Sequence, residues 1–479
     1  MVTSASRWHA AGTSSVVRMA NAIGSSAPLS GRVLLAAAVG ALVLTLVALF
    51  GLGRTEAVHL LGVPTMQPPG VDACTISGAS LSLAQGLDPL QQNPGDVLGR
   101  PLNYPRVWLV LAWLGLRPEH TPWLLAGFFL VFAAGALSLA SLVRTRAQGA
   151  LLALAVWSPA VWLGLERGNS DLFAFGLTAV ALWLAAARPN VAAALVLLAA
   201  VAKLFPAFAL FGFVAGNLRQ RRAGLVAAAL FAGYVAATFG DLAKIRAGTF
   251  HWNRIGYGID QAAVTLAKNG ASLPLLLGLA IGAALLLFAA GGWLRTRIRL
   301  PLGDGETDGA PDADITVGGD RGSRRRELAA VAMGFRAGAA VYVGSFCLGS
   351  SFDYRLMFLL PALPQLCLWS AALRGRWRWC ARATLAAVVL LLWSMSWRAG
   401  LRSLFGSAGE GFGLLADELL SWLVFGALVV GGWLAVPDAL LPRRWRGRPF
   451  VAVAVPISAA SLAPRAVAAA EPTPPAEVG

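Results

Sequence analysis

The run VLLAAAVGALVLTLVALFGLG, residues 33–53, decides the class of this fold. Its 21 residues include no charged side chain, and about 20 apolar residues suffice for a helix to cross a bilayer. The run is too long for the apolar part of a secretory signal, and no small-residue cleavage site follows it. We therefore expect an uncleaved first membrane span, preceded by a cytoplasmic segment over residues 1–32.

Similar apolar runs recur through most of the 479-residue chain. Only 13% of its residues are charged, against roughly 25% in a soluble protein. We predict an all-α polytopic membrane protein whose transmembrane domain covers residues 33–436. After the first run, the others lie at 106–116, 123–143, 150–165, 171–187, 191–203, 206–216, 223–240, 273–294, 328–349, 356–373, 383–397 and 418–436.

The basic residues between these runs predict how the chain is threaded. The run 106–116 is short and precedes Pro118 and Pro122, so we expect it to lie at the membrane interface. The remaining runs then give about twelve transmembrane helices and place nearly every arginine cluster, with both termini, in the cytoplasm. The net charge of +16 is explained by these topology signals and by contacts with anionic lipids, and not by nucleic acid binding.

Two segments of this threading are expected to be cytoplasmic and largely disordered. The loop 295–327 is rich in Gly and Asp over its central part, and the tail 437–479 is rich in Ala and Pro. The opposite, extracytoplasmic side receives a long first loop, residues 54–105, and a Gly-rich loop, residues 398–417. The short runs 191–203 and 206–216 are predicted to form a helical hairpin with Lys203-Leu204-Phe205-Pro206 at its tip, because proline ends a helix.

Polar residues of several outer turns are the candidates for a site, since ionisable groups at span ends are costly unless they have a role. The first loop carries Asp72, Asp88 and Asp96. Each could be a plain solvated loop residue, and Asp88 before Pro89 and Asp96 after Asn93-Pro94-Gly95 stand in turn contexts. Asp72 has no such explanation, and a carboxylate near an apolar surface can accept a proton from a hydroxyl.

Cationic residues in the same set of turns suit a phosphate. Arg167 stands in the turn Glu166-Arg167-Gly168-Asn169-Ser170-Asp171, and Lys203 lies deep in the apolar hairpin. Structural explanations stay open: Glu166 could pair with Arg167, Asp171 could cap the next helix, and Lys203 could extend its ammonium to the interface. The remaining candidates are Arg106, which follows Asn103-Tyr104-Pro105, then Asp353-Tyr354-Arg355, and His251 with Trp252.

The order and common sidedness of these motifs resemble the bacterial polyprenol-phosphate-mannose-dependent mannosyltransferases of the C-type superfamily of integral-membrane glycosyltransferases. The residues that carry the resemblance are Asp72, Asn103-Tyr104-Pro105-Arg106, Glu166 to Asp171, Lys203 to Pro206, and Ser351 to Arg355. It implies a C-type fold in the bacterial inner membrane and inverting transfer of a sugar, such as mannose, from a polyprenyl-phosphate donor to a lipid or glycan acceptor outside the cytoplasm.

The resemblance also implies a role for each motif. Asp72 would be the catalytic base; Arg106, Arg167, Lys203 and Arg355 would hold the donor phosphate. The sugar or the acceptor would contact Asn103, Tyr104, Glu166, Asn169, Asp171, His251, Trp252, Asp353 and Tyr354. No nucleotide or other cofactor is expected, no Cys or His spacing typical of a metal site occurs, and a need for a divalent cation is left open. A flippase for a lipid-linked sugar and a non-catalytic assembly protein remain alternatives.

Overall fold

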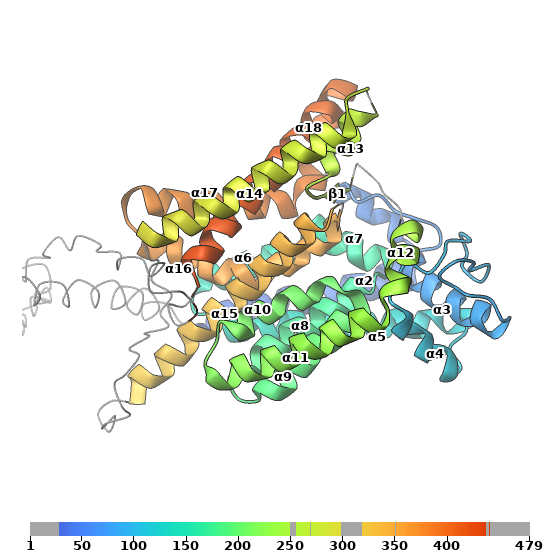
Figure 1. Ribbon diagram of the computed structural model, residues 1–479, viewed down its shortest axis with the longest axis horizontal. Helices are drawn as coiled ribbons and strands as arrows, with labels where there is room; N and C mark the ends of the chain where they lie inside the picture. Colours follow the sequence, from blue (N-terminus) through green and yellow to red (C-terminus); the bar gives the residue numbers. More distant parts are fainter. Residues whose placement is uncertain are drawn as a thin grey trace, which may run out of the picture.

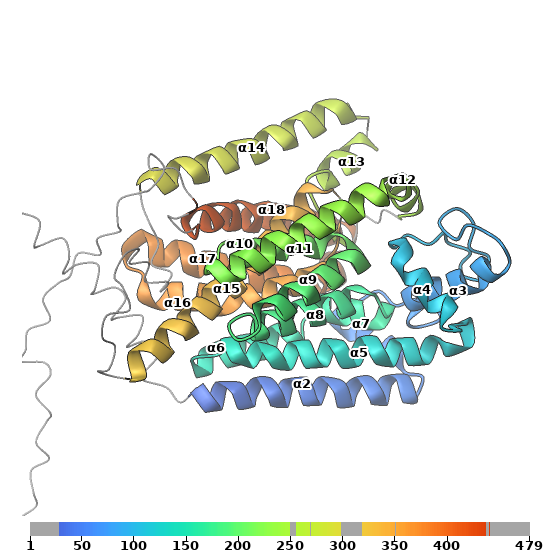
Figure 2. The same cartoon turned by 60° about the horizontal axis from the view of Figure 1, so that its bottom comes forward.

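The computed structural model describes residues 28–249, 255–268, 270–297, 319–349, 351–436 and 440. Most of the described chain is helical, and the helices run roughly along one long axis (Figures 1 and 2). The predictions for residues 1–27, for most of the loop 295–327 and for the tail beyond residue 440 lie outside the described residues, as do those for His251 and Trp252.

The first half of the chain forms short and long helices in sequence. They are α2 (Pro28–Gly51), η1 (Thr55–Leu61), α3 (Val71–Ala84), η2 (Arg106–Leu109), α4 (Val110–Trp113), η3 (Pro118–His120), α5 (Thr121–Ser138), η4 (Leu139–Leu142), α6 (Arg146–Val156), α7 (Pro159–Arg167), α8 (Asp171–Leu184), α9 (Pro189–Lys203), η5 (Phe205–Ala209), α10 (Leu210–Val214), α11 (Leu218–Ala237) and α12 (Phe239–Gly248).

The second half adds the longest helices and two very short strands. They are β1 (Gly256–Tyr257), α13 (Gln261–Ala267), α14 (Leu273–Arg297), α15 (Gly319–Cys347), β2 (Ser351–Phe352), η6 (Asp353–Ala362), α16 (Leu363–Ala372), α17 (Gly375–Leu392) and α18 (Ser394–Leu434). The strands β1 and β2 pair antiparallel, with Gly256 opposite Phe352 and Tyr257 opposite Ser351.

Six helical segments are long and apolar enough to cross a membrane, or eight if two bent helix pairs each count as one span. The six lie within residues 29–51, 118–142, 273–297, 326–347, 353–372 and 394–434, and the bent pairs are α6 with α7 and α11 with α12. Their number shows that the protein is embedded in a membrane. The exposed side chains of α14, among them Leu275, Leu279 and Leu286, are the kind that lipid covers.

Small residues let the central helices approach closely. A Cβ added to Gly135 in α5 would lie 2.5 Å from Cα of Gly176 in α8, and contacts between small residues of this kind are typical of membrane helices. α8 packs in turn on α9, and α9 packs on α11. The helix break predicted at Lys203–Pro206 is present: α9 ends at Lys203, Leu204 has a φ of 66°, and the following η5 and α10 pack back on α9.

One predicted loop is instead helical. Residues 398–417 belong to α18, which bends back on itself at Gly406, where φ is 58° and ψ is −137°. The two arms are close because small residues face the opposite arm: a Cβ on Gly409 would lie 2.1 Å from the carbonyl oxygen of Leu401. Gly409, one of the glycines that suggested a loop, therefore serves close helix packing.

The polar turns gather at one end of the molecule. α3, α4 and α12 lie together at the right-hand end in Figures 1 and 2. The starts of α2 and α6 meet at the other end, where a Cβ on Gly31 would lie 2.4 Å from the carbonyl oxygen of Thr145. Arg144 also pairs with Glu327 of α15 there, at 3.4 Å.

Candidate functional site

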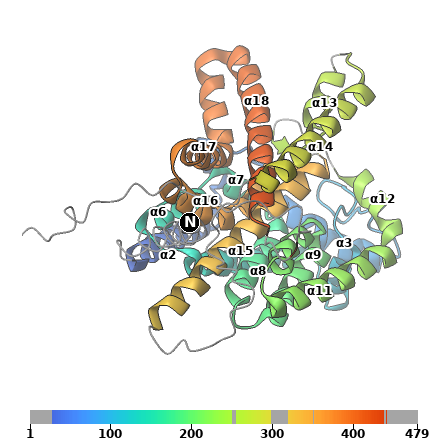
Figure 3. The same ribbon diagram turned by 60° about the vertical axis from the view of Figure 1, so that its left-hand side comes forward.

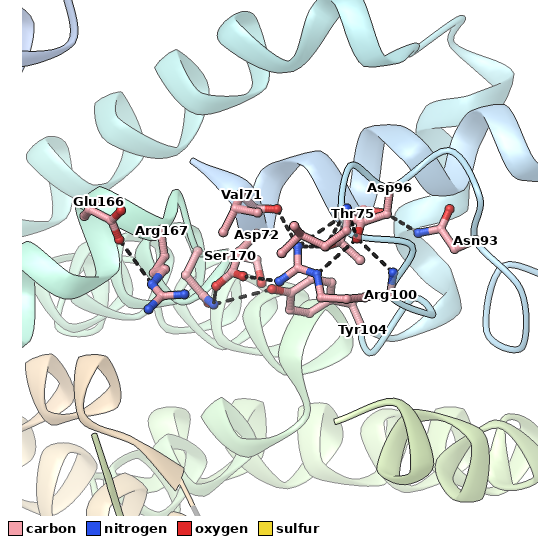
Figure 4. Close-up of polar contacts among 12 residues, drawn as sticks. Val71, Asp72, Thr75, Asn93, Asp96, Arg100, Tyr104, Glu166, Arg167 and Ser170 are labelled. Carbon is pink, nitrogen blue, oxygen red and sulfur yellow. Dashed lines mark hydrogen bonds and ion pairs between the residues drawn. The ribbon is translucent and has the colours of Figure 1, made fainter. Parts of the chain in front are cut away.

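Asp72 begins the site, at the first turn of α3. Gly70 before this helix has a φ of 76°, a left-handed conformation that glycine adopts without strain. Oδ1 of Asp72 accepts a hydrogen bond from Nη1 of Arg100 at 3.1 Å, and Oδ2 accepts one from Nδ2 of Asn169 at 2.6 Å. The carboxylate is thus oriented from two sides, by the first loop and by the turn between α7 and α8 (Figure 4).

Arg100 is the centre of the polar contacts in the first loop (Figure 4). Besides Asp72, its guanidinium donates to the carbonyl of Val71 at 2.7 Å and to Oγ1 of Thr75 at 2.5 Å. It also donates to both carboxylate oxygens of Asp96, at 3.1 and 3.2 Å. Asp96 therefore does more than form a turn, because its fully buried carboxylate holds the arginine that holds Asp72.

The turn between α7 and α8 brings a second group of residues to Asp72. Gly168 has a φ of 57°, and a Cβ there would lie 2.1 Å from a methyl carbon of Leu125. This position requires glycine for both its backbone and its packing. Asn169 follows, and its side chain reaches Asp72 through Nδ2 and accepts from Nζ of Lys203 through Oδ1 at 3.1 Å. Asn169 consequently links the carboxylate of the first loop to the tip of the α9 hairpin.

Lys203 is buried in this cluster. Its ammonium lies 2.9 Å from Oδ1 of Asp171 and donates to Oγ of Ser170 at 3.2 Å. It also lies 4.0 Å above the ring of Tyr104, a favourable cation–π geometry. Asp171 does not cap α8 with its side chain, as the sequence suggested, because its carboxylate is turned to Lys203 instead.

Arg355 completes the group from the segment after β2. Its Nε lies 3.5 Å from Oδ2 of Asp171, its Nη1 donates to Oγ of Ser351 at 2.7 Å, and its guanidinium lies 4.7 Å above the ring of Phe205. Asp171 is therefore flanked by two cations from distant parts of the chain. The Tyr104 hydroxyl lies 3.4 Å from Nδ2 of Asn169; burial and, to a smaller extent, the charge of Asp72 raise the pKa of this phenol, which keeps its proton at neutral pH.

Glu166 and Arg167 close the cluster on the far side of Asp72 (Figure 4). Their side chains pair at 3.1 Å, as the sequence allowed, and Glu166 accepts a hydrogen bond from the backbone N–H of Met66 at 2.6 Å. The backbone carbonyl of Glu166 accepts from the N–H of Gly70 at 2.7 Å. These contacts attach the start of α3 to the end of α7.

Exposure separates Asp72 from the other carboxylates of the cluster. Its side chain is 14% exposed, whereas those of Asp96, Asp171 and Glu166 are at most 1% exposed. We call the site cluster the four acidic and four basic residues of three neighbouring ionic groups: Asp72, Asp96 and Arg100; Asp171, Lys203 and Arg355; and Glu166 with Arg167. Asn169 joins the first group to the second. Its formal charges cancel, and Asp72 is the acidic member that a ligand could reach.

Arg106 lies in a different ionic group. It forms two hydrogen bonds with Asp241 of α12, at 2.9 and 2.8 Å, and contacts Asp88 at 3.3 Å. Lys244, also on α12, lies 2.9 Å from Asp88. The predicted phosphate ligand is thus part of a network that fastens α12 to the first loop.

A third group contains Asp353. It lies 3.6 Å from Nη2 of Arg398, whose Nη1 donates to Asp417 at 2.6 Å within α18. Tyr354 is buried next to it and stacks on Phe352 with ring centroids 5.4 Å apart. Asn103 is half-buried beside Tyr104, and its Cβ faces Gly248 at the end of α12.

The sequence therefore predicted the members of the site cluster except Arg100 and Asp96, the second of which it explained as a turn residue. It also gave no sign of Thr75, which Arg100 contacts. The spacing of Asp96 and Arg100, four residues apart, is a weak signal for a pair and occurs outside any helix. Asp241 and Lys244 on α12, and Asp417 on α18, had no signal beyond their charge. Among the described residues, no group of three or more His, Cys, Asp or Glu has the arrangement to hold a metal ion.

Comparison with known proteins adds no relative. No family model, no curated protein and no solved structure matches this chain.

Proposed function

We propose that this protein transfers a sugar from a polyprenyl-phosphate donor to a lipid or glycan acceptor, on the extracytoplasmic side of a bacterial inner membrane. The proposal assigns the chain to the C-type membrane glycosyltransferase fold. It rests on one observation above all: the carboxylate of Asp72 is partly exposed while those of the other acidic residues of the site cluster are buried, and Arg100 and Asn169 hold it in place.

In the proposed reaction Asp72 is the general base. The acceptor hydroxyl attacks the anomeric carbon, its proton passes to the carboxylate of Asp72, and the bond between the sugar and the phosphate oxygen breaks. A carboxylate has about four lone-pair sites. The hydrogen bonds that Asp72 accepts from Arg100 and Asn169 therefore leave room for an acceptor hydroxyl.

The leaving phosphate needs a cation to stabilise its growing charge. Arg355 is the best candidate, because its side chain is 18% exposed and its contact with Asp171, at 3.5 Å, is the longest of the ion pairs in the cluster. Lys203 is less suited, since only 7% of its side chain is exposed and Asp171, Asn169 and Ser170 surround its ammonium. We assign Lys203 the role of positioning Asn169 and Asp171.

The proposed topology has twelve spans with both termini in the cytoplasm. The helices α8, α9 and η5 with α10 count as spans here although each is short, because they are covered by other helices. In favour of this threading, α2, α6 and α15 lie close together at the end of the molecule away from α3. Gly31 there approaches Thr145, and Arg144 pairs with Glu327. The basic residues at that end would then face the cytoplasm.

The direct test is a transfer assay with the purified protein. Radiolabelled polyprenyl-phosphate sugars and membrane lipid are incubated with wild type, Asp72→Asn and, as the matched control, Glu56→Gln. Glu56 is an exposed carboxylate of the same outer segment. We expect turnover to fall about 10²-fold or more in Asp72→Asn and to stay at the wild-type level in Glu56→Gln.

Two results would contradict the proposal. If Asp72→Asn turns over normally while Asp88→Asn or Asp353→Asn is inactive, the base is misassigned. If the wild-type protein moves a lipid-linked sugar between the leaflets of a vesicle and forms no new glycosidic bond, the flippase alternative replaces the transferase.

A further inference from the structure

The two arms of α18 around Gly406 form a helical hairpin, residues 394–417, which we call the α18 hairpin. Arg402 and Glu410 pair across it at 3.7 Å, and Arg398 and Asp417 pair at 2.6 Å. In Figure 3, α18 projects at the top of the picture, as does α13. The hairpin is therefore a distinct element beside the site cluster and is not used by the proposed reaction.

A cavity of about 470 Å³ lies between the α18 hairpin and two segments of the outer face. Its polar lining comes from the hairpin, with Arg398, Arg402, Ser403 and Glu410. Its apolar lining includes Pro64, which follows η1, and Leu414. A cavity of this size accommodates a small organic group such as a sugar.

The charges around this cavity give an anion no advantage. Two guanidinium groups and one carboxylate line it, but Arg398 is backed by the buried carboxylates of Asp353 and Asp417. Glu410 and these two buried groups offset the two guanidinium groups, so the surroundings of the cavity carry no net positive charge. Guanidinium donors, a carboxylate acceptor and the Ser403 hydroxyl in one wall instead match the mixed donors and acceptors of a neutral polyhydroxylated group.

The outer face of the same hairpin is apolar. The side chains of Leu404, Phe405, Phe412 and Leu415 are between 58% and 75% exposed. In a membrane protein such side chains face lipid chains, and these lie within a few residues of the polar cavity wall. A molecule that fills the cavity with a hydroxylated head would therefore find an apolar surface for its chain immediately outside.

We infer that this cavity binds the head of a neutral, polyhydroxylated amphiphile, whose hydrocarbon chain lies along the apolar face of the α18 hairpin. The cavity adjoins the site cluster through Asp353, which contacts Arg398 and is two residues from Arg355. If the protein is the transferase proposed above, this amphiphile is its acceptor, and the cavity holds a part of it other than the reacting hydroxyl, because Asp72 does not line the cavity. That last assignment rests on the proposed function, whereas the binding site does not.

The test is photolabelling of the full-length protein in nanodiscs of phosphatidylcholine. The probe is dodecyl β-glucoside with a diazirine in the chain next to the sugar, and mass spectrometry locates the adduct. We expect labelling on residues 394–417, and competition by unlabelled dodecyl β-glucoside at least fivefold stronger than by dodecyl β-glucuronide, which differs by one carboxylate. Labelling spread evenly over lipid-facing helices such as α14, or equal competition by the glucuronide, would overturn the inference.

Two variants sharpen the result. Leu414→Trp fills the cavity and should reduce labelling at least fivefold, whereas Leu423→Trp places the same side chain at a position of α18 that is 56% exposed and should label as wild type. Arg402→Gln, at a 64% exposed side chain that folding tolerates, should reduce labelling severalfold. Wild-type labelling of both Leu414→Trp and Arg402→Gln would exclude the cavity.

The proposed function is tested separately. Asp72→Asn should label as wild type, because Asp72 does not line the cavity. Labelling at the hairpin in a protein without transferase activity would keep the site and remove its role as the acceptor site. Transferase activity without labelling at the hairpin would remove the site and leave the proposed function.

Discussion

Replacing Lys203 by Met should destabilise the protein strongly, because the buried carboxylate of Asp171 loses its closest cation. The further substitution Asp171→Asn should restore most of that stability. Asp171 is fully buried, and Lys203 is its close partner at 2.9 Å, while Arg355 lies at 3.5 Å. Removing one member of a buried ion pair typically costs 3–5 kcal/mol, because a buried charge is left without its partner. Arg355 compensates part of this, so we expect about 3 kcal/mol for Lys203→Met.

The double variant Lys203→Met/Asp171→Asn removes both charges together. Its net charge equals that of the wild type, and no buried carboxylate is left uncompensated at position 171. We expect it to recover most of the lost stability, leaving a deficit of about 1 kcal/mol. Unfolding in mixed micelles, with wild type and both variants in the same detergent, measures the differences. The reasoning about the pair is refuted if Lys203→Met is as stable as wild type, or if the double variant is no more stable than Lys203→Met.

The same double variant separates structure from donor binding. An ammonium has three N–H donors, and Asp171, Asn169 and Ser170 engage the ammonium of Lys203. We therefore expect a polyprenyl-phosphate donor to bind the folded double variant within about threefold of its wild-type affinity. A loss of more than tenfold would show that Lys203 contacts the phosphate, as the sequence resemblance implied.

Two further predictions concern the outer face. Burial alone would raise the pKa of Asp88, but its hydrogen bonds from Lys244, the Leu90 backbone and Arg106 outweigh this and lower that pKa below 3.8. The contacts of Asp88 thus stabilise the folded state at pH values above the pKa that Asp88 has in the unfolded chain, and this stability is lost as the pH falls through the lowered pKa. Hydrogen exchange of α12 should therefore accelerate below about pH 4 in wild type. In Asp88→Asn the protonation of residue 88 no longer contributes to this pH dependence. For topology, a cysteine in place of exposed Gln91 should react with a membrane-impermeant maleimide added outside the cell. A cysteine in place of exposed Leu218 should react only after permeabilisation. The reverse pattern would show that the chain has the opposite orientation in the membrane.

The sequence predicted the fold class because long apolar runs have few structural alternatives. Nearly every run coincides with a helix, and the break at Lys203–Pro206 was marked by a proline. The α18 hairpin was missed because glycine signals both loops and close helix packing, and only tertiary contact decides between them. At Gly409 the contact is with the backbone of Leu401 on the other arm.

The membership of the site cluster was partly predictable, but its pairing was not. Asp72, Asn169 and Lys203 were found from their positions in outer turns. Arg100 was not found, because its role depends on how the first loop folds back along α3: a Cβ on Gly78 would lie 2.4 Å from the carbonyl of Gly95. That close approach brings Asp96 and Arg100 to Asp72, and a single sequence carries no sign of it.

The balance of charge in the site cluster constrains how a donor phosphate can bind. Each of the four cations already contacts a carboxylate, so a phosphate gains a cation as its partner only by taking over one of these contacts. The pair between Arg355 and Asp171 is the one that can be exchanged with least loss, because it is the longest and Asp171 keeps Lys203 at 2.9 Å. Arg100 cannot be released in this way, since Asp96 would be left buried without its cation. Arg355 would therefore turn to the phosphate while Lys203, Asn169 and Arg100 keep Asp72 in place. Arg100 and Asn169 would then orient the base, and Arg355 would stabilise the leaving group.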